Sequence, residues 1–372
     1  MQKFQFAAPC LLGLEGLVAD DLRRMDMENV EAQNGRVLFT GDVNALARAN
    51  IRSRYCERIL IEVGSFTAVT FDELFEQTKA LPWEEFLGSL DAFPVSGSCL
   101  ASALHSEPDC QKIIKKAIVE RLKTVYRKAW FDETGSECQI RFLIMKNKVS
   151  ISLNTSGEGL HKRGYRNNSV IAPIKETLAA AIADLAHVRP DSTVYDPCCG
   201  SGTLLIEAAY KALNVAPGFR RTFACEKWDW VSKEAFSSER AAAMQMIRKG
   251  IGFTGIGGDI DPAAVELTNS NAKKASVASR VKAQAGDIRD FKPTTETGVV
   301  LCNPPYGERL LDFKSAREIY KIMGKKFERR EGFSYYIISP DEEFEQVFGR
   351  PADKRRKLYN GMLKCQLYMY FQ

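Results

Sequence analysis

A short proline-rich segment, Asn303-Pro304-Pro305-Tyr306, combines an amide, a carbonyl between two proline rings and an aromatic side chain. Because proline fixes the backbone, the Asn303 side-chain oxygen and the Pro304 carbonyl can act as a rigid pair of acceptors. Such a pair can draw the hydrogens of a conjugated NH2 group toward tetrahedral geometry, while Tyr306 stacks on the ring that carries the nitrogen. Asn303, Pro304 and Tyr306 are therefore candidate catalytic residues for chemistry on a planar amino nitrogen. A simple proline turn is the alternative.

The elements after residue 165 alternate between strand and helix. Strands are expected at residues 193–195, 254–258, 281–285 and 298–302, and helices at residues 204–213 and 263–274. This alternation is typical of a parallel α/β sheet with both faces covered. Ligands bind at the carboxyl edge of such sheets, where Asn303 follows its strand. Residues 334–339 and 363–371 are expected to pair as an antiparallel edge.

A glycine-rich turn, DPCCGSGT at residues 196–203, follows the first of these strands. Glycine lets the backbone approach a ligand closely at this edge. The spacing is neither GxGxxG nor a loop that ends in GK[ST]. We expect a nucleotide-like ligand here, with contacts to the following residues: Asp196, Cys198, Gly200, Gly202 and Thr203.

Two further acids follow the next two strands. Asp259 is placed to accept hydrogen bonds from ribose hydroxyls, and Asp287 to hold an adenine amino group. Each acid alone is compatible with a helix N-cap, but three acids at successive strand ends favour one pocket, to which Asn303 also contributes. Glu226 lies nearer the usual spacing of about 20 residues. Asp259 is preferred because residues 219–248 are predicted to be an insertion.

The first 65 residues follow the order βαββαβ, which matches a ferredoxin-like unit. Its elements are expected at residues 4–8, 14–25, either side of Asn34-Gly35, 44–52 and 58–66. A second unit follows, with helices expected at residues 72–80 and 109–129 and strands at residues 95–102, 138–145 and 148–154.

Positive charge is localised along the chain. Residues 1–110 contain nine basic and 17 acidic residues, whereas residues 111–372 contain 43 basic and 30 acidic residues. This asymmetry suits a polyanionic partner. The helix expected at residues 109–129 is amphipathic with a basic outer side that includes Lys112, Lys115 and Lys116, although a solvated face would give the same pattern.

A second basic segment interleaves cations with aromatic residues, which suits phosphate contact together with base stacking. We expect it to bind nucleic acid through these residues: His161, Lys162, Arg163, Tyr165 and Arg166.

Taken together, these motifs resemble those of THUMP-bearing class I RNA methyltransferases, especially the branch similar to the guanine-N2 methyltransferase module for 23S ribosomal RNA. The resemblance covers nearly the whole chain and is strongest in LHKRGYR (160–166), APIKE (172–176), DPCCGSGT and NPPYGER (303–309). It implies a Rossmann-like class I methyltransferase domain at residues 166–372, preceded by an α+β region. That region would comprise a ferredoxin-like unit at residues 1–65 and a THUMP RNA-binding domain at residues 66–165.

The same resemblance implies that S-adenosyl-L-methionine is the cofactor, that residues 172–176 border its pocket and that the partner is ribosomal RNA. The product would be N2-methylguanine. The target base must be unpaired or flipped outward to reach Tyr306, because a stacked base is inaccessible.

Three other functions remain open from the sequence. Adenine N6 in RNA or DNA is also a conjugated amine, and related chains are often labelled adenine-N6 DNA methylases. A protein glutamine amide is a planar nitrogen as well, but the basic segments argue against it. A non-catalytic RNA-binding or assembly factor is disfavoured because Asn303, Tyr306 and all three acids are present.

Composition bears on metal and location. None of the ten cysteines is spaced as CxxC and there are only three histidines, so we expect no metal site and reduced thiols. The N-terminus lacks the pattern of a signal peptide, and no apolar stretch approaches 18 residues. We therefore expect a cytoplasmic protein with no membrane partner.

Overall fold

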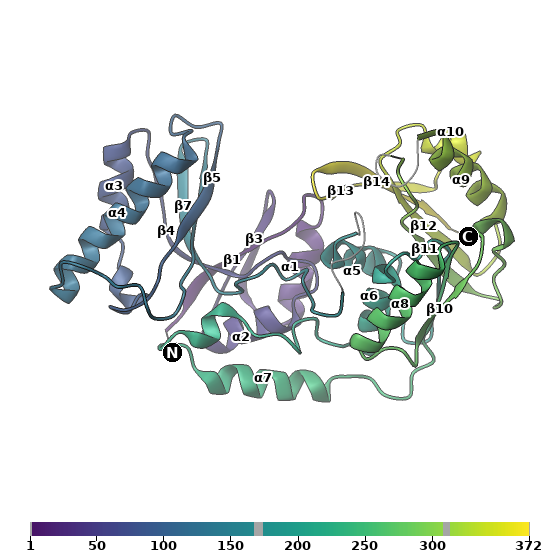
Figure 1. Ribbon diagram of the computed structural model, residues 1–372, viewed down its shortest axis with the longest axis horizontal. Helices are drawn as coiled ribbons and strands as arrows, with labels where there is room; N and C mark the ends of the chain where they lie inside the picture. The colour runs from purple at the N-terminus through teal and green to yellow at the C-terminus, as the bar shows by residue number, and fades with distance from the viewer. Residues whose placement is uncertain (1, 167–173, 308–312, 372) are drawn as a thin grey trace.

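The computed structural model describes residues 2–166, 174–307 and 313–371. Two seven-stranded sheets lie side by side along the long axis of the molecule, the first at the left and the second at the right of Figure 1. Among the described residues, no helix is long and apolar enough to span a membrane.

The first part of the chain forms the predicted βαββαβ unit. Its elements are β1 (Phe4–Pro9), α1 (Glu15–Arg24), β2 (Glu28–Gln33), β3 (Arg36–Gly41), α2 (Val43–Arg52) and β4 (Leu60–Thr67). The strand order β2-β3-β1-β4 is that of a ferredoxin-like fold. The Asp42 side chain caps α2 by accepting the amide hydrogen of Ala45, as Asp commonly does at a helix start.

The second unit continues the same sheet. It consists of α3 (Phe71–Lys79), β5 (Val95–Leu100), α4 (Glu107–Tyr126), β6 (Ile140–Met145) and β7 (Lys148–Asn154). Strand β7 pairs antiparallel with β4, with Leu60 opposite Asn154, and the full order is β2-β3-β1-β4-β7-β6-β5. The two predicted N-terminal units therefore share one sheet.

The second sheet has the predicted parallel α/β architecture. Its elements are α5 (Glu176–Leu185), β8 (Thr193–Asp196), α6 (Thr203–Leu213), α7 (Lys233–Gln245), β9 (Thr254–Asp259), α8 (Pro262–Lys274), β10 (Val281–Ala285), β11 (Gly298–Cys302), α9 (Phe313–Lys326), β12 (Phe333–Ser339), α10 (Phe344–Phe348), β13 (Lys354–Asn360) and β14 (Leu363–Tyr370). The order is β10-β9-β8-β11-β12-β14-β13, with the first five strands parallel. The predicted antiparallel pairing of β12 with β14 is confirmed, whereas β13 was not predicted.

Two apolar cores cover opposite faces of this sheet. The larger core runs without interruption from the first sheet to α5 and α6. The smaller core lies under α9 and α10 and includes Tyr320, Met323 and Phe344. Because the larger core is continuous, the two halves of the molecule are joined by it. Buried apolar area of this kind is the main source of stability.

The predicted insertion at residues 219–248 packs against the first sheet. Helix α7 contacts α2, below it in Figure 1. The indole nitrogens of Trp228 and Trp230 donate hydrogen bonds to the carbonyls of Glu137 and Phe86 at 3.0 and 3.2 Å. The insertion therefore helps to join the two halves of the molecule.

Candidate methyl-transfer site and nucleic-acid interface

The glycine-rich turn connects β8 to α6 at the carboxyl edge of the second sheet. Gly200 and Gly202 have φ values of +53° and +77°, a region that favours glycine. A Cβ atom on Gly202 would lie 2.7 Å from the Thr268 side chain of α8, whereas one on Gly200 would meet nothing within 4 Å. Gly202 therefore allows close helix packing, and Gly200 faces open space.

Asp259 at the end of β9 is joined directly to this turn. Its carboxylate accepts the amide hydrogen of Gly200 at 2.9 Å and that of Asp261 at 3.0 Å. By contrast, Glu226 pairs with Arg240 and accepts from the amide of Phe223. Of the two acids considered for a ribose, Asp259 is the one that lies beside the glycine turn.

Asp196 ends β8 and is almost fully buried, with 2% of its surface exposed. Burial raises the pKa of this carboxyl to about 8, and nearby Asp259 adds to the effect, while the hydrogen bond from the Cys198 amide opposes it. Asp196 therefore binds a proton at neutral pH, because the charged form is poorly solvated.

Asp287 follows β10 and caps the short helix Ile288–Asp290. Its carboxylate accepts from the backbone amide of Arg289 at 2.8 Å and from the guanidinium of the same residue at 2.6 and 2.9 Å. These bonds lower the pKa of Asp287. A Cβ on neighbouring Gly286 would meet nothing within 4 Å, so open space adjoins this acid too.

The remaining predicted ligand contacts of the turn are Cys198 and Thr203. The Cys198 side chain is half-buried and lies near the thiol of Cys302, the last residue of β11. The Thr203 hydroxyl is buried 2.9 Å from that of Ser201. Thr203 thus contacts the interior of the turn, while Cys198 links the turn to the strand before Asn303.

The segment Asn303-Pro304-Pro305-Tyr306 follows β11, which lies between β8 and β12. Tyr306 donates its hydroxyl hydrogen to the Asn303 side-chain oxygen. Tyr320 of α9 donates to the Pro305 carbonyl at 3.0 Å. The sequence did not identify Tyr320 as an anchor, because it is 15 residues away on a helix. Glu308 and Arg309 of the motif lie outside the described residues.

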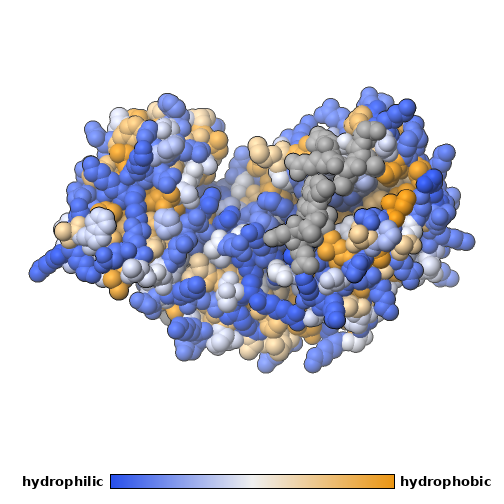
Figure 2. Space-filling view, in the orientation of Figure 1, coloured by the Kyte–Doolittle hydropathy of each residue, from blue (hydrophilic) through white to orange (hydrophobic). Residues whose placement is uncertain are grey.

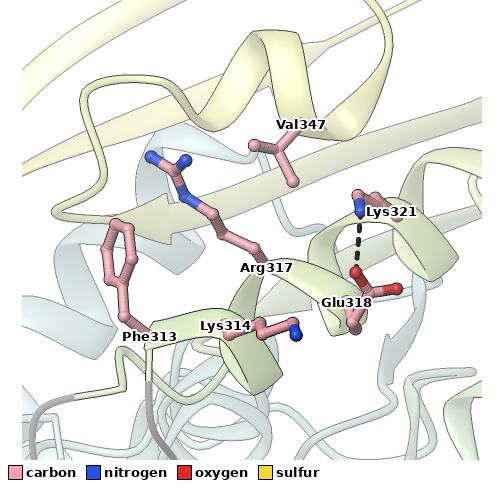
Figure 3. Close-up of a pocket in the computed structure, with 6 residues that line it drawn as sticks. All are labelled: Phe313, Lys314, Arg317, Glu318, Lys321 and Val347. Carbon is pink, nitrogen blue, oxygen red and sulfur yellow. Dashed lines mark hydrogen bonds and ion pairs between the residues drawn. The ribbon is translucent and has the colours of Figure 1, made fainter.

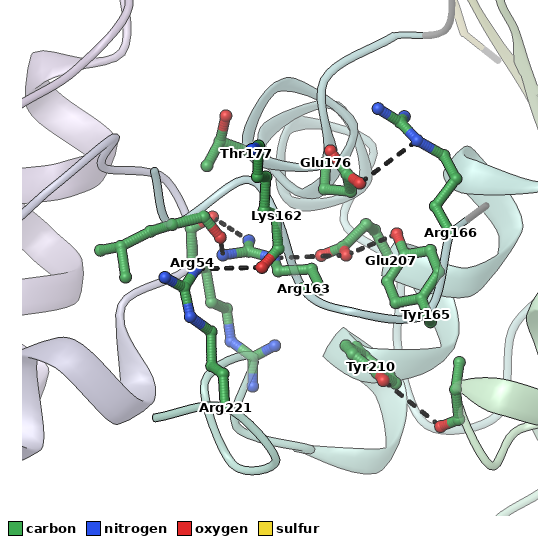
Figure 4. A network of polar contacts seen from close by, with 12 residues as sticks. Arg54, Lys162, Arg163, Tyr165, Arg166, Glu176, Thr177, Glu207, Tyr210 and Arg221 are labelled. Atoms are coloured by element: carbon green, nitrogen blue, oxygen red, sulfur yellow. Dashed lines mark hydrogen bonds and ion pairs between the residues drawn. The ribbon is translucent and has the colours of Figure 1, made fainter. Parts of the chain in front are cut away.

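The basic segment at residues 161–166 is largely interior, which corrects part of the prediction. Arg163, only 5% exposed, donates to the carbonyls of Leu160 and Arg54 at 2.6 Å and lies 3.5 Å from the Glu207 carboxylate (Figure 4). The buried Tyr165 hydroxyl donates to Glu207 at 2.9 Å. Arg163 and Tyr165 are therefore inaccessible to a nucleic acid, and they bind the segment to α6.

The other members of this segment differ in accessibility. His161 lies 3.3 Å from Glu57, and Arg166 lies 3.5 Å from Glu176 and donates to the Ile174 carbonyl at 2.9 Å. Lys162 is exposed, with only an exposed ion pair to Glu158. Of the APIKE segment, residues 172 and 173 lie outside the described residues.

The three predicted lysines of α4 also differ. Lys112 is 79% exposed at its side chain, and Lys116 lies over the Phe75 ring at 5.8 Å. Lys115 turns inward: its ammonium donates to the Phe93 carbonyl at 3.0 Å and pairs with Glu133 at 2.6 Å. The Lys115 ammonium group therefore makes its contacts within the protein rather than with solvent.

A shallow hollow of about 670 Å³ lies on α9, the helix that anchors Pro305. Its lining consists of Val347 of α10 and, from α9, Phe313, Lys314, Arg317, Glu318 and Lys321 (Figure 3). Glu318 pairs with Lys321 at 2.7 Å. Arg317 is held by Asp341 at 2.9 and 3.1 Å. Lys314, Arg317 and Lys321 were not predicted from the sequence to form a site, although their spacing of three and four residues is a visible helical signal.

Among the described residues, no group of three or more His, Cys, Asp or Glu side chains is arranged to hold a metal ion.

Comparisons with known proteins assign each part of the chain. The family model for an RMKL-like methyltransferase domain matches residues 163–369. The RlmL ferredoxin-like domain matches residues 5–60, and the THUMP domain matches residues 68–154.

Curated relatives extend over the whole chain. "Putative RNA methyltransferase YpsC" of Bacillus subtilis (strain 168) is 43% identical over 373 residues, which cover 100% of this chain and 97% of the relative. "Ribosomal RNA large subunit methyltransferase K/L" of Psychromonas ingrahamii is 32% identical over 97% of this chain but only 49% of its own length. The chain spans about half the length of the K/L relatives.

Solved structures give the same picture. One described as "a predicted N6-adenine-specific DNA methylase" from Listeria monocytogenes has a TM-score of 0.93 and 44% identity, covering 100% of this chain and 97% of that one. SMU.472, "a putative methyltransferase complexed with SAH", has a TM-score of 0.93 and 40% identity, covering 100% and 98%.

The fold and the acid-lined sheet edge define a class I methyltransferase that uses S-adenosyl-L-methionine. The chain belongs to the RMKL-like methyltransferase family, and with its THUMP domain it is an RNA methyltransferase.

Proposed function

We propose that the chain transfers a methyl group from S-adenosyl-L-methionine to N2 of a guanine in 23S ribosomal RNA, and that it does so in the cytoplasm. One observation carries the proposal: Asn303 follows a strand that pairs with the strand ending in Asp196, so the acceptor pair and the glycine turn share one sheet edge. The names of the K/L relatives support large-subunit ribosomal RNA as the substrate.

We also propose that the chain is divided into three functional units, at residues 1–65, 66–165 and 166–372.

The cofactor would lie against the turn formed by Asp196, Cys198, Gly200, Gly202 and Thr203. Asp259 would accept hydrogen bonds from its ribose, and Asp287 would hold its adenine. The open space beside Gly200 and Gly286 is consistent with a ligand at both positions. When bound, S-adenosyl-L-methionine supplies the methyl group from its sulfonium sulfur.

The protein's part in the reaction is positioning and hydrogen bonding. The Asn303 side-chain oxygen and the Pro304 carbonyl would accept hydrogen bonds from the two N–H groups of the target amino group, which shifts the nitrogen lone pair out of conjugation. The Tyr306 ring would stack on the base and hold its nitrogen in line with the methyl group. The methylated nitrogen carries a positive charge and releases one proton to water, so this arrangement requires no strong general base.

The RNA would be bound by exposed cations of the first half of the molecule, principally Lys112, Lys116 and Lys162. The surface is hollowed between the two halves at the top of Figure 2. A base flipped out of its stack could enter from there. His161 and Arg166, which are only partly exposed, would border this path.

The proposal is tested by incubating the purified protein with labelled S-adenosyl-L-methionine and ribosomal RNA that lacks this modification. Mass spectrometry of the digested RNA should find N2-methylguanosine. The Asn303→Ala variant serves as the matched control and should give none.

Adenine N6 is a second candidate, favoured by the description of the Listeria relative. N6-methyladenosine in the same digest would replace the guanine assignment while keeping the catalytic loop. Label found in protein rather than RNA would instead indicate a glutamine amide. Absence of any transfer, with intact cofactor binding, would favour a non-catalytic RNA-binding role.

A further inference from the structure

A second cavity lies on the opposite edge of the methyltransferase sheet from Asn303. It has a volume of about 390 Å³ and is bounded by the segments that follow α6 and α8 and the segment that precedes β9. These segments lie at the amino ends of β9 and β10. The six residues of β9 span about 20 Å at roughly 3.3 Å per residue, so this cavity is distinct from the site at Asp259.

The lining of this cavity is strongly cationic. It contains seven Lys or Arg residues and, among the described lining residues, no Asp or Glu. Arg163 is one of the lining residues and is already paired with Glu207 (Figure 4). The other six cations are Arg220, Arg221, Arg248, Lys249, Lys274 and Arg280.

Backbone carbonyls, which orient an arginine without neutralising it, hold three of these side chains. Arg221 donates to the carbonyls of Glu158 and Gly159, both at 2.8 Å. Arg220 donates to the Lys274 carbonyl at 3.0 Å, and Arg248 to a carbonyl of α6 at 3.1 Å. The guanidinium groups are thus fixed in place while retaining their charge.

Most of the remaining cations are not paired with a carboxylate of the described residues. In the parts of the chain that the structure describes, no ion pair joins Arg220, Arg221, Arg248, Lys249 or Arg280 to a carboxylate. Burial, together with the nearby guanidinium groups of Arg163 and Arg58, lowers the pKa of Arg221 to about 10. A positive potential of this kind attracts an anion.

We propose that this cavity is a binding site for a phosphate group, presented either by the RNA backbone far from the methylated base or by a free phosphorylated molecule. Arginine forks match phosphate oxygens with paired, charge-assisted hydrogen bonds. The hydroxyls of Ser276 and Ser279 in the same lining add further donors. The site is independent of which base is methylated.

The test uses the full chain saturated with S-adenosylhomocysteine, titrated calorimetrically with inorganic pyrophosphate at low salt. The side chains of Lys249 and Arg280 form no hydrogen bond or ion pair with the parts of the chain that the structure describes, and the backbone bonds of Arg280 to Val277 and Gly255 do not depend on its side chain. The double variant K249Q/R280Q should therefore fold normally. It should bind pyrophosphate about tenfold more weakly or worse, the scale of losing one or two charge-assisted hydrogen bonds.

Lys233→Gln is the matched control, because Lys233 is exposed at the start of α7 and outside the cavity. It should leave pyrophosphate affinity unchanged. The proposal is overturned if the unaltered protein does not bind pyrophosphate, or if K249Q/R280Q binds it as tightly as K233Q does.

RNA titrations then distinguish the two sources of the phosphate. If RNA supplies it, K249Q/R280Q loses RNA affinity and pyrophosphate competes with RNA. If a free molecule supplies it, RNA affinity is unchanged and only pyrophosphate binding falls. Neither titration measures methyl transfer, so failure of the guanine assignment would leave these results unaffected.

Discussion

The hydroxyl of Tyr306 donates a hydrogen bond to the side-chain oxygen of Asn303. This oxygen is the acceptor that the proposed reaction assigns to the target amino group. An amide oxygen has two lone pairs, so the amino group of an entering base either shares this oxygen with the Tyr306 hydroxyl or displaces it. Tyr306 is also the residue proposed to stack on the base. Binding of the base and access to the Asn303 oxygen are therefore coupled through the hydrogen bond between Tyr306 and Asn303.

Asn303→Ala should reduce methyl transfer by about 10²–10³-fold or more, the effect of removing one preorganised hydrogen-bonding group. The fold should be little affected, because the hydrogen bond that is lost at the Asn303 side chain is the one from the Tyr306 hydroxyl. Single-turnover transfer is the measurement, with thermal melting as the control. Unchanged transfer would rule out Asn303 as the acceptor.

Tyr306→Phe and Tyr306→Ala separate stacking from hydrogen bonding. Phenylalanine keeps the ring and frees Asn303, so transfer should stay within a few-fold of the unaltered protein. Alanine removes stacking worth about 1–3 kcal/mol, which corresponds to roughly a 5- to 150-fold loss. Equal losses in both variants, measured as kcat/KM for RNA, would contradict a stacking role.

Asp196 should make the ligand-free protein less stable as pH rises. Its folded pKa of about 8 lies above the ordinary value of 3.8, so folding retains a proton that the unfolded chain releases. The stabilising effect is present below about pH 4 and is lost progressively as the pH rises toward 8. Asp196→Asn should therefore gain in melting temperature relative to the unaltered protein between pH 5 and pH 8. A constant difference across this range would be inconsistent with the raised pKa.

Arg163→Ala should destabilise the protein by about 3–5 kcal/mol, because it leaves the buried Glu207 carboxylate without its cation. Urea unfolding measures this change. Lys162→Ala is the neighbouring control and should change stability by less than about 0.5 kcal/mol, as is usual at the surface. A stable Arg163→Ala protein with weakened RNA binding would restore the original assignment of Arg163 to the interface.

Lys112→Ala and Lys116→Ala should weaken RNA binding without affecting folding. Each lost phosphate contact should reduce the slope of log affinity against log salt by about 0.7–1. Lys115→Ala provides a contrast: it breaks the contacts with Phe93 and Glu133, so it should lower the melting temperature instead. Identical salt slopes for Lys112→Ala and the unaltered protein would exclude Lys112 from the interface.

The arrangement of Asp196, Asp259 and Asn303 could be predicted because parallel strands bring their carboxyl ends to one edge. Once the strands were identified in the sequence, the proximity of these three residues could be predicted. The antiparallel strand β13 was missed because its sequence, KRRKLYN, is mostly charged and lacks the apolar pattern of a buried strand.

The burial of Arg163 and Tyr165 could not be predicted in the same way. An arginine beside a tyrosine has the same local pattern on a surface as in the interior, and the deciding residue, Glu207, is 42 positions from Tyr165. The pairing of β4 with β7 has the same origin, since it joins residues about 90 positions apart. Such partners are fixed by tertiary packing rather than by local sequence.

Among the described residues, a common apolar core and the insertion that packs against the first half join the THUMP region to the sheet that carries Asn303. An RNA bound by the first half would therefore have its binding site at a constant distance from Asn303, the residue proposed to accept a hydrogen bond from the target amino group. We therefore expect the protein to select its target by distance along the RNA as well as by base identity. A guanine a few nucleotides nearer or farther would be chemically suitable but would not reach the acceptor.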